Sequence, residues 1–113
     1  MNINRDLIAA SVTPLLLSLL EQEECYGYLI IQRIKRSSDG ALEWSEGMLY
    51  PVLHRLEKRG LIASQWKTAE NGRRRKYYAI TKKGRAELER QREEWGAVER
   101  ALRRLGFHAS AER

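Results

Sequence analysis

The residue types that most often carry chemistry are scarce in this sequence. Its 113 residues include one cysteine and two histidines, so the chain can form neither an intramolecular disulfide nor a set of metal ligands at usable spacing. It also lacks a glycine-rich phosphate loop, and no nucleophile stands next to a base that a third residue could orient. We therefore expect no catalytic residues, no metal, no cofactor and no enzymatic activity.

Long apolar runs are absent as well. The longest, residues 7–20, is interrupted by Ser11, Thr13, Pro14 and Ser18 and falls short of the roughly 18 to 20 residues that cross a bilayer. The opening residues, MNINRDL, lack the cationic region and apolar stretch of a secretion signal. We expect a chain that does not enter a membrane and stays in the cytoplasm.

Positive charge is what the sequence has in excess. There are 21 lysines and arginines against 15 aspartates and glutamates, which gives a net charge of +6 and a pI of about 9.8. Such an excess favours an anionic partner when it gathers on one side of the fold. A length of 113 residues with 42% hydrophobic residues suits one compact domain.

Apolar spacing predicts four helices. They are expected over residues 6–22, 26–40, 45–59 and 82–105. Ser45 and Thr81 are suitable N-caps for the third and fourth helices, and Gly60 is a suitable stop for the third. Pro14 leaves two alternatives for the first helix: a kink, or a restart with Thr13 as the cap.

Between the last two helices the period changes to that of strands. Two β-prone runs, 61–68 and 74–81, flank the pair Asn71-Gly72 and predict a hairpin. Residues 41–44, between the second and third helices, are too few for more than a bridge strand.

Three helices, a hairpin and a helix are the order of a mainly α (α+β) winged helix-turn-helix. We expect residues 1–80 to form its DNA-binding domain, with the first helix contributing to a dimer, and residues 81–113 to form a dimerisation helix and tail, in one compact unit.

The third helix has two distinct faces. One is an apolar stripe that we expect in the core. The other offers small groups, then hydrogen-bond donors and cations, and we expect it to contact DNA: Ser45, Gly47, Tyr50, Pro51, His54, Arg55 and Lys58. Our hypothesis for the costly internal proline is that Gly47 and Pro51 let this end approach a groove wall closely; the alternative is a tolerated kink without a role.

The hairpin carries the densest positive charge in the chain. Arg73, Arg74, Arg75 and Lys76 are consecutive, and because like charges repel, folding alone explains them poorly. Alternation along a strand should divide them between its two faces. Beside a cationic helix face, they are expected to contact DNA phosphates or a minor groove.

The fourth helix has the spacing of a coiled-coil seam, weakened by Gly84 and Gln91. Its apolar members are expected in a dimer interface: Leu88, Trp95, Val98, Leu102 and Leu105. Packing on the chain's own first helix is the alternative, but a domain this small has little core to spare, so we expect the two helices to pack between subunits. A twofold dimer would place two recognition helices about 34 Å apart and require an inverted-repeat operator in double-stranded DNA.

Several motifs together resemble the PadR-like transcriptional regulators, in the small subfamily with a single C-terminal helix. They are YGYLIIQRIK, LEWSEGMLYPVLHRLEKRGLI, GRRRKYYAITKKG and REEWGAVERAL. The resemblance implies a homodimeric winged-helix repressor, with residues 72–76 as the wing, Tyr50 on the phosphate backbone, and His54 and Arg55 near base edges or phosphates. Two residues depart from the family pattern: Leu29 stands where a polar residue is common and could add a contact surface, and Pro14 interrupts a usually continuous helix.

The resemblance also implies a site for a planar aromatic effector at the dimer centre. Its lining would be Leu7, Ala10, Pro14, Trp95, Val98 and Glu99, with Glu99 favouring a cationic guest. The alternative is that Trp95 is an interface anchor without a ligand. An alternative function is that of a winged-helix adaptor that binds a protein rather than an operator, but such a module has little use for both a cationic helix and a cationic wing.

Overall fold

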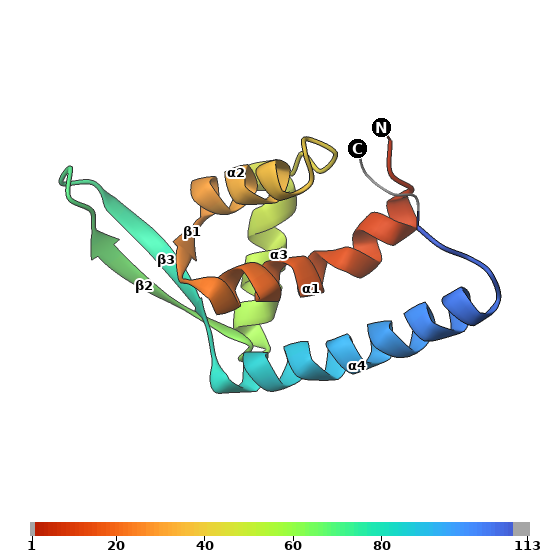
Figure 1. Cartoon of the computed structure of the whole chain (residues 1–113). Coiled ribbons are helices and arrows are strands. Elements are labelled where there is room, and N and C mark those ends of the chain that lie inside the picture. Colours follow the sequence, from red (N-terminus) through yellow and green to blue (C-terminus); the bar gives the residue numbers. More distant parts are fainter. Residues whose placement is uncertain (1, 110–113) are drawn as a thin grey trace.

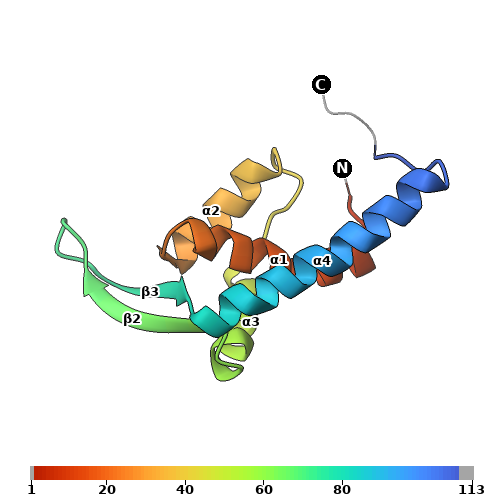
Figure 2. The ribbon, with the colours of Figure 1, turned by 60° about the horizontal axis from the view of Figure 1, so that its bottom comes forward.

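The computed structural model describes residues 2–109 and shows four helices and a three-stranded sheet over that range (Figure 1). The elements, in chain order, are α1 (Arg5–Gln22), β1 (Cys25–Tyr26), α2 (Gly27–Ser37), α3 (Glu46–Lys58), β2 (Ile62–Thr68), β3 (Arg74–Ile80) and α4 (Lys82–Arg104). The long hairpin of β2 and β3 projects away from the helices in both views (Figures 1 and 2). This is a winged helix-turn-helix with a long C-terminal helix, as expected.

The predicted starts of α3 and α4 and the predicted end of α3 are confirmed by their capping residues, whereas α2 ends at Ser37, earlier than the predicted end at Gly40. Ser45 caps α3, because its hydroxyl accepts a hydrogen bond from the amide of Met48 at 3.2 Å. Thr81 caps α4 in the same way, accepting from the amide of Gly84 at 3.0 Å. Gly60 follows α3 with φ of +78°, a left-handed conformation that glycine adopts without strain.

The expectation of a bridge strand at residues 41–44 needs correction. Residues 41–44 form no strand, because Trp44 packs into the core instead, with 5% of its surface exposed. The short strand is β1, which pairs antiparallel with β3 through Cys25 opposite Tyr78 and Tyr26 opposite Tyr77. Of the two alternatives left open for Pro14, the restart does not occur, because α1 is one helix that runs through Pro14 from a cap at Asn4.

The core lies where α1, α2 and α3 meet the base of the sheet. Its fully buried side chains come from every helix, from β1 and from the residues around the start of β2: Leu16, Leu17, Cys25, Ile30, Leu49, Leu53, Leu56, Leu61, Ile62 and Leu88. The apolar face of α3 is therefore in the core, as predicted. Leu29 is partly buried and packs against this core, so much of its side chain contacts its own chain.

The long helix α4 belongs to the core only in its first half. Gly84 and Leu88 are buried there, and Arg92 donates to Glu21 of α1 at 2.7 Å. The structure thus places Leu88 in its own chain's core rather than on a dimer surface, and α1 and α4 meet within one chain, antiparallel to each other (Figures 1 and 2). Heptad spacing marks an apolar stripe but cannot tell whether its partner is the same chain.

Candidate nucleic-acid interface

The predicted DNA-facing residues of α3 all lie on its exposed side. Ser45, Gly47, Tyr50, Pro51, His54, Arg55 and Lys58 are exposed. A Cβ atom built on Gly47 would have only the hydroxyl of Ser45 nearby, at 3.7 Å. No neighbour within the described residues thus requires glycine here, and the surface over this turn is open to an approaching molecule.

In the wing, alternation divides the cations between two faces, as predicted. The register pairs Trp66 with Lys76, and Thr68 with Arg74, on one face; Arg75 lies on the other, opposite Lys67. An aromatic ring underlies each of these strand cations. The Arg75 guanidinium lies 4.3 Å from the ring centre of Tyr26, the Arg74 guanidinium 5.7 Å from that of Trp66, and the Lys76 ammonium 5.8 Å from that of Tyr78. At these distances cation–π attraction holds the cations near the strand.

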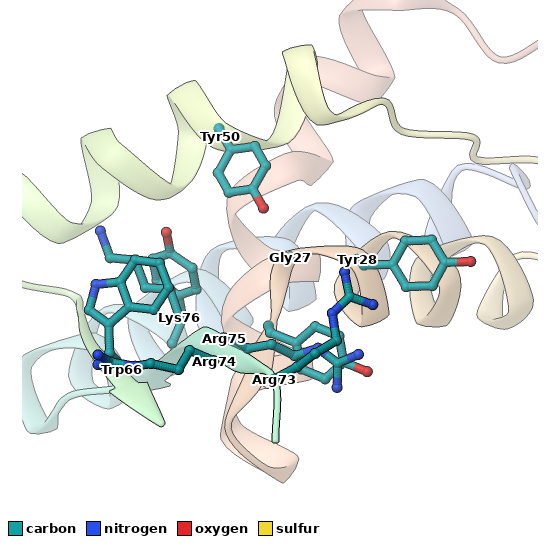
Figure 3. Close-up of a pocket in the computed structure, with 10 residues that line it drawn as sticks. Gly27, Tyr28, Tyr50, Trp66, Arg73, Arg74, Arg75 and Lys76 are labelled. Atoms are coloured by element: carbon teal, nitrogen blue, oxygen red, sulfur yellow. The ribbon is translucent and has the colours of Figure 1, made fainter. Parts of the chain in front are cut away.

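The helix and the wing meet at an open groove of about 790 Å³. The sheet order is β1-β3-β2, and β1 pairs only with Tyr77 and Tyr78, so the segment 74–76 of β3 borders this space. Tyr50 of α3 enters the groove from the opposite side (Figure 3). The complete lining is Tyr26, Gly27, Tyr28, Tyr50, Trp66, Arg73, Arg74, Arg75, Lys76 and Tyr78.

The electrostatic field of the groove is positive. It has four cationic side chains, and none of the described residues that line it is acidic. Glu57, the acid on α3 that is nearest to the sheet, accepts a hydrogen bond from Ser64 of β2 at 2.5 Å. Burial, with smaller contributions from Tyr50 and Glu57, raises the pKa of Tyr78, so this phenol remains neutral. Because little acid competes with an incoming anion, the groove can bind phosphate groups.

Of the predicted DNA-binding residues, the groove gathers five: Tyr50, Arg73, Arg74, Arg75 and Lys76. The others line the exposed face of α3 outside it. The sequence prediction missed its aromatic wall and one glycine, namely Tyr26, Gly27, Tyr28, Trp66 and Tyr78. Aromatic residues interleaved with cations in the strand sequences were the available signal, but Tyr26 and Tyr28 lie about 40 residues earlier in the chain and meet the wing only in the fold.

The six predicted effector residues do not form a single pocket within one chain. Pro14 and Trp95 line a cleft of about 250 Å³ between α1 and α4. Val98 and Glu99 lie with Trp95 at a second cleft of about 600 Å³ along α4, and Glu99 pairs with Arg103 at 3.6 Å. Leu7 and Ala10 are on the exposed surface of α1.

Four predicted members of the dimer seam are exposed in the single chain: Trp95, Val98, Leu102 and Leu105. They occupy the half of α4 that extends beyond the core. Within residues 2–109, no group of histidine, cysteine and acidic residues could hold a metal ion. In the same part of the chain, no helix is both long and apolar enough to cross a membrane.

Comparisons with known proteins agree with this geometry. The sequence profile of the "Transcriptional regulator PadR-like family" matches residues 16–90. The chain is 35% identical over 88 residues to the transcriptional regulator Rv3488 of Mycobacterium tuberculosis, an alignment that covers 78% of each chain. It is similar in structure to a PadR-like transcriptional regulator from Bacillus cereus, with a TM-score of 0.79 and 33% identity over 88% of this chain and 95% of that one.

A transcriptional regulator from Clostridium thermocellum gives a TM-score of 0.78 at 34% identity, covering 89% of this chain and 98% of the other. The family profile spans α3 and the whole wing. The chain therefore belongs to the PadR-like family of transcriptional regulators, DNA-binding proteins rather than enzymes, and to its small members with a single C-terminal helix.

Proposed function

We propose that the protein is a homodimeric repressor that binds an inverted-repeat operator through α3 and the wing. The observation that carries the proposal is the open groove in which Tyr50 of α3 faces four consecutive cations of the wing. A DNA strand that follows this groove brings phosphates to the wing arginines, while the exposed face of α3 turns toward the major groove.

Each set of residues has a separate role in this proposal. The Tyr50 hydroxyl donates a hydrogen bond to a phosphate oxygen, and Arg73 and Arg74, the most exposed wing cations, neutralise phosphates. His54 and Arg55 of α3 contact base edges or the phosphates beside them. Phosphate contacts set the position of the protein on the duplex, and base contacts select the sequence.

Dimerisation is supported by the apolar surface that a single chain leaves uncovered. Trp95 and Val98 of α4 are 45% and 58% exposed, Leu105 just after α4 is 86% exposed, and Leu7 of α1 is 54% exposed. Large apolar side chains left exposed on one helix favour an association site in a soluble protein. A twofold pairing of α1 and α4 covers these side chains and presents two copies of α3 to successive turns of one face of the duplex.

We also propose that a planar aromatic effector binds at this dimer interface. The cleft beside Trp95 and Pro14 would be enlarged by the second subunit, with Glu99 available to a cation. Titration with planar aromatic cations, followed by tryptophan fluorescence, should give a saturable change. No saturable change across a broad panel would remove the effector from the proposal and leave Trp95 as an interface anchor.

Selection of bound duplexes from a random DNA pool tests the main proposal. We expect enrichment of a palindrome whose half-sites are centred about 34 Å, one helical turn, apart. A reporter gene under the selected operator should be silenced by the protein. Selection of no sequence at all, combined with tight binding of a protein partner, would instead support the adaptor function.

A further inference from the structure

Gly27, the first residue of α2, lies directly against Tyr50 of α3. A Cβ atom built on Gly27 would overlap the hydroxyl oxygen of Tyr50 and lie 2.9 Å from Cζ of its ring. The backbone of Gly27 is helical, so its conformation does not require glycine. The close approach of the Tyr50 side chain is therefore what leaves no room for a side chain at this position.

Tyr50 and its neighbours lie at the junction of α2, α3 and the wing. Its ring lies near the buried Tyr78 of β3, whose pKa it helps to raise, and its hydroxyl points toward Gly27, between α2 and the wing (Figure 3). Tyr50 is nevertheless 42% exposed. A side chain at position 27 would therefore displace the hydroxyl end of Tyr50 from its place in the groove.

We propose that Gly27 is a positioning residue for DNA binding: because it has no side chain, Tyr50 lies across the start of α2 with its hydroxyl held in the groove opposite Arg73 and Arg74. This inference rests on the proposed function. Gly27 needs no contact with DNA in this role, because it acts through the tyrosine. A methyl group at position 27 would displace the end of a flexible side chain and leave the helix backbone in place.

The test is the affinity of Gly27→Ala for the selected operator, measured by fluorescence anisotropy. We expect a loss on the order of fivefold or more, the usual effect of one lost hydrogen bond. The slope of log affinity against log salt should stay unchanged, because Tyr50 carries no charge. Thermal stability should stay equal or rise, because alanine favours helix more than glycine does. Ser37→Ala, at the exposed far end of the same helix, is the matched control and should change nothing.

A double-mutant cycle separates this role from a general effect on α2. Tyr50→Ala alone should lose affinity to a similar degree, and adding Gly27→Ala to it should cause no further loss, because the displaced group is gone. An equal loss from Gly27→Ala in both backgrounds, or unchanged affinity in the wild-type background, would overturn the proposal. Absence of operator binding by the unsubstituted protein would overturn the proposed function and this inference together.

Discussion

At the scale of single residues, the four wing cations differ in how free their charge is. Arg73 and Arg74 are exposed, whereas Arg75 and Lys76 are partly buried. Arg75 lies over Tyr26 of β1, which also packs edge to face on Tyr77 at 5.4 Å between ring centres. Arg75 thus helps to hold β1 on β3, while the guanidinium groups of Arg73 and of Arg74, which lies beside Trp66, are exposed to incoming phosphates. A consecutive cationic run therefore contains both structural and functional charges.

One acidic residue on α4 should give the stability of the protein a measurable dependence on pH. Hydrogen bonds from Arg90 and Gln91 lower the pKa of Glu87 from 4.5 to about 2. Because the pKa is lower in the folded state, the stabilisation is present above pH 4.5 and is lost as the pH falls toward 2. We expect Glu87→Gln to lower the free energy of unfolding at pH 7 by about 0.5 kcal/mol, since Arg90 is more than half exposed and solvent screens the pair.

Urea unfolding of Glu87→Gln and wild type at pH 7 and pH 2.5 measures this contribution. The difference in free energy of unfolding between wild type and Glu87→Gln should be smaller at pH 2.5 than at pH 7. Glu93→Gln is the matched control, an exposed glutamate of the same helix for which residues 2–109 show no ion pair. If that difference in free energy were the same at both pH values, the result would contradict a lowered pKa for Glu87.

At the scale of elements, α4 contains two glycines with opposite consequences. A Cβ atom on Gly84 would overlap the carbonyl oxygen of Leu61 and lie 2.7 Å from Cγ1 of Ile80, so backbone would have to move. We expect Gly84→Ala to destabilise the fold by about 2 kcal/mol despite its higher helix propensity. On Gly96 the nearest atom would be the flexible guanidinium of Arg100, at 3.3 Å, and Gly96→Ala should stabilise by about 0.5 to 1 kcal/mol.

Denaturant unfolding of the two variants at equal protein concentration compares them. We expect the free energy of unfolding to fall for Gly84→Ala and to rise for Gly96→Ala. Since both changes add the same methyl group to the same helix, the difference between them reports the packing around each glycine. If Gly84→Ala were as stable as Gly96→Ala, this result would contradict the close packing of Gly84 against Leu61 and Ile80.

Elements that carry their own signals were predictable from the sequence, and elements made by their partners were not. Ser45, Thr81 and Gly60 mark their helix ends locally, so these boundaries could be read directly. The strand β1 has two residues and no periodicity of its own; it exists because Tyr77 and Tyr78 pair with it. In the same way, the cations of the groove are consecutive in the sequence and could be predicted from it. The aromatic residues that line the groove come from separate segments and meet only in the fold.

At the scale of the whole molecule, binding to an inverted-repeat operator requires two copies of the chain. Leu102 lies with Trp95 and Val98 on the half of α4 that extends beyond the core. We expect Leu102→Glu to shift the protein from dimer to monomer in sedimentation equilibrium, because burying an unpaired charge at an apolar interface is costly. Operator affinity should fall with it, since one half-site is held by each subunit.

Arg100→Glu is the control for this change, because it places the same charge on the opposite side of α4. It should leave the dimer intact. A wild-type chain that sediments as a monomer at concentrations where it binds its operator tightly would contradict the twofold arrangement.

The most direct measurement for the central claim is the salt dependence of operator affinity. We predict a steep linear fall of log affinity with log salt. For the double variant Arg73→Ala/Arg74→Ala we predict a slope smaller by up to about 3.6, since each lost phosphate contact contributes about 0.9 and a dimer loses up to four. The pair Arg100→Ala/Arg104→Ala, toward the end of α4 that is remote from the wing (Figure 1), should leave the slope unchanged. Equal slopes for all three proteins would contradict a DNA interface at the groove between α3 and the wing.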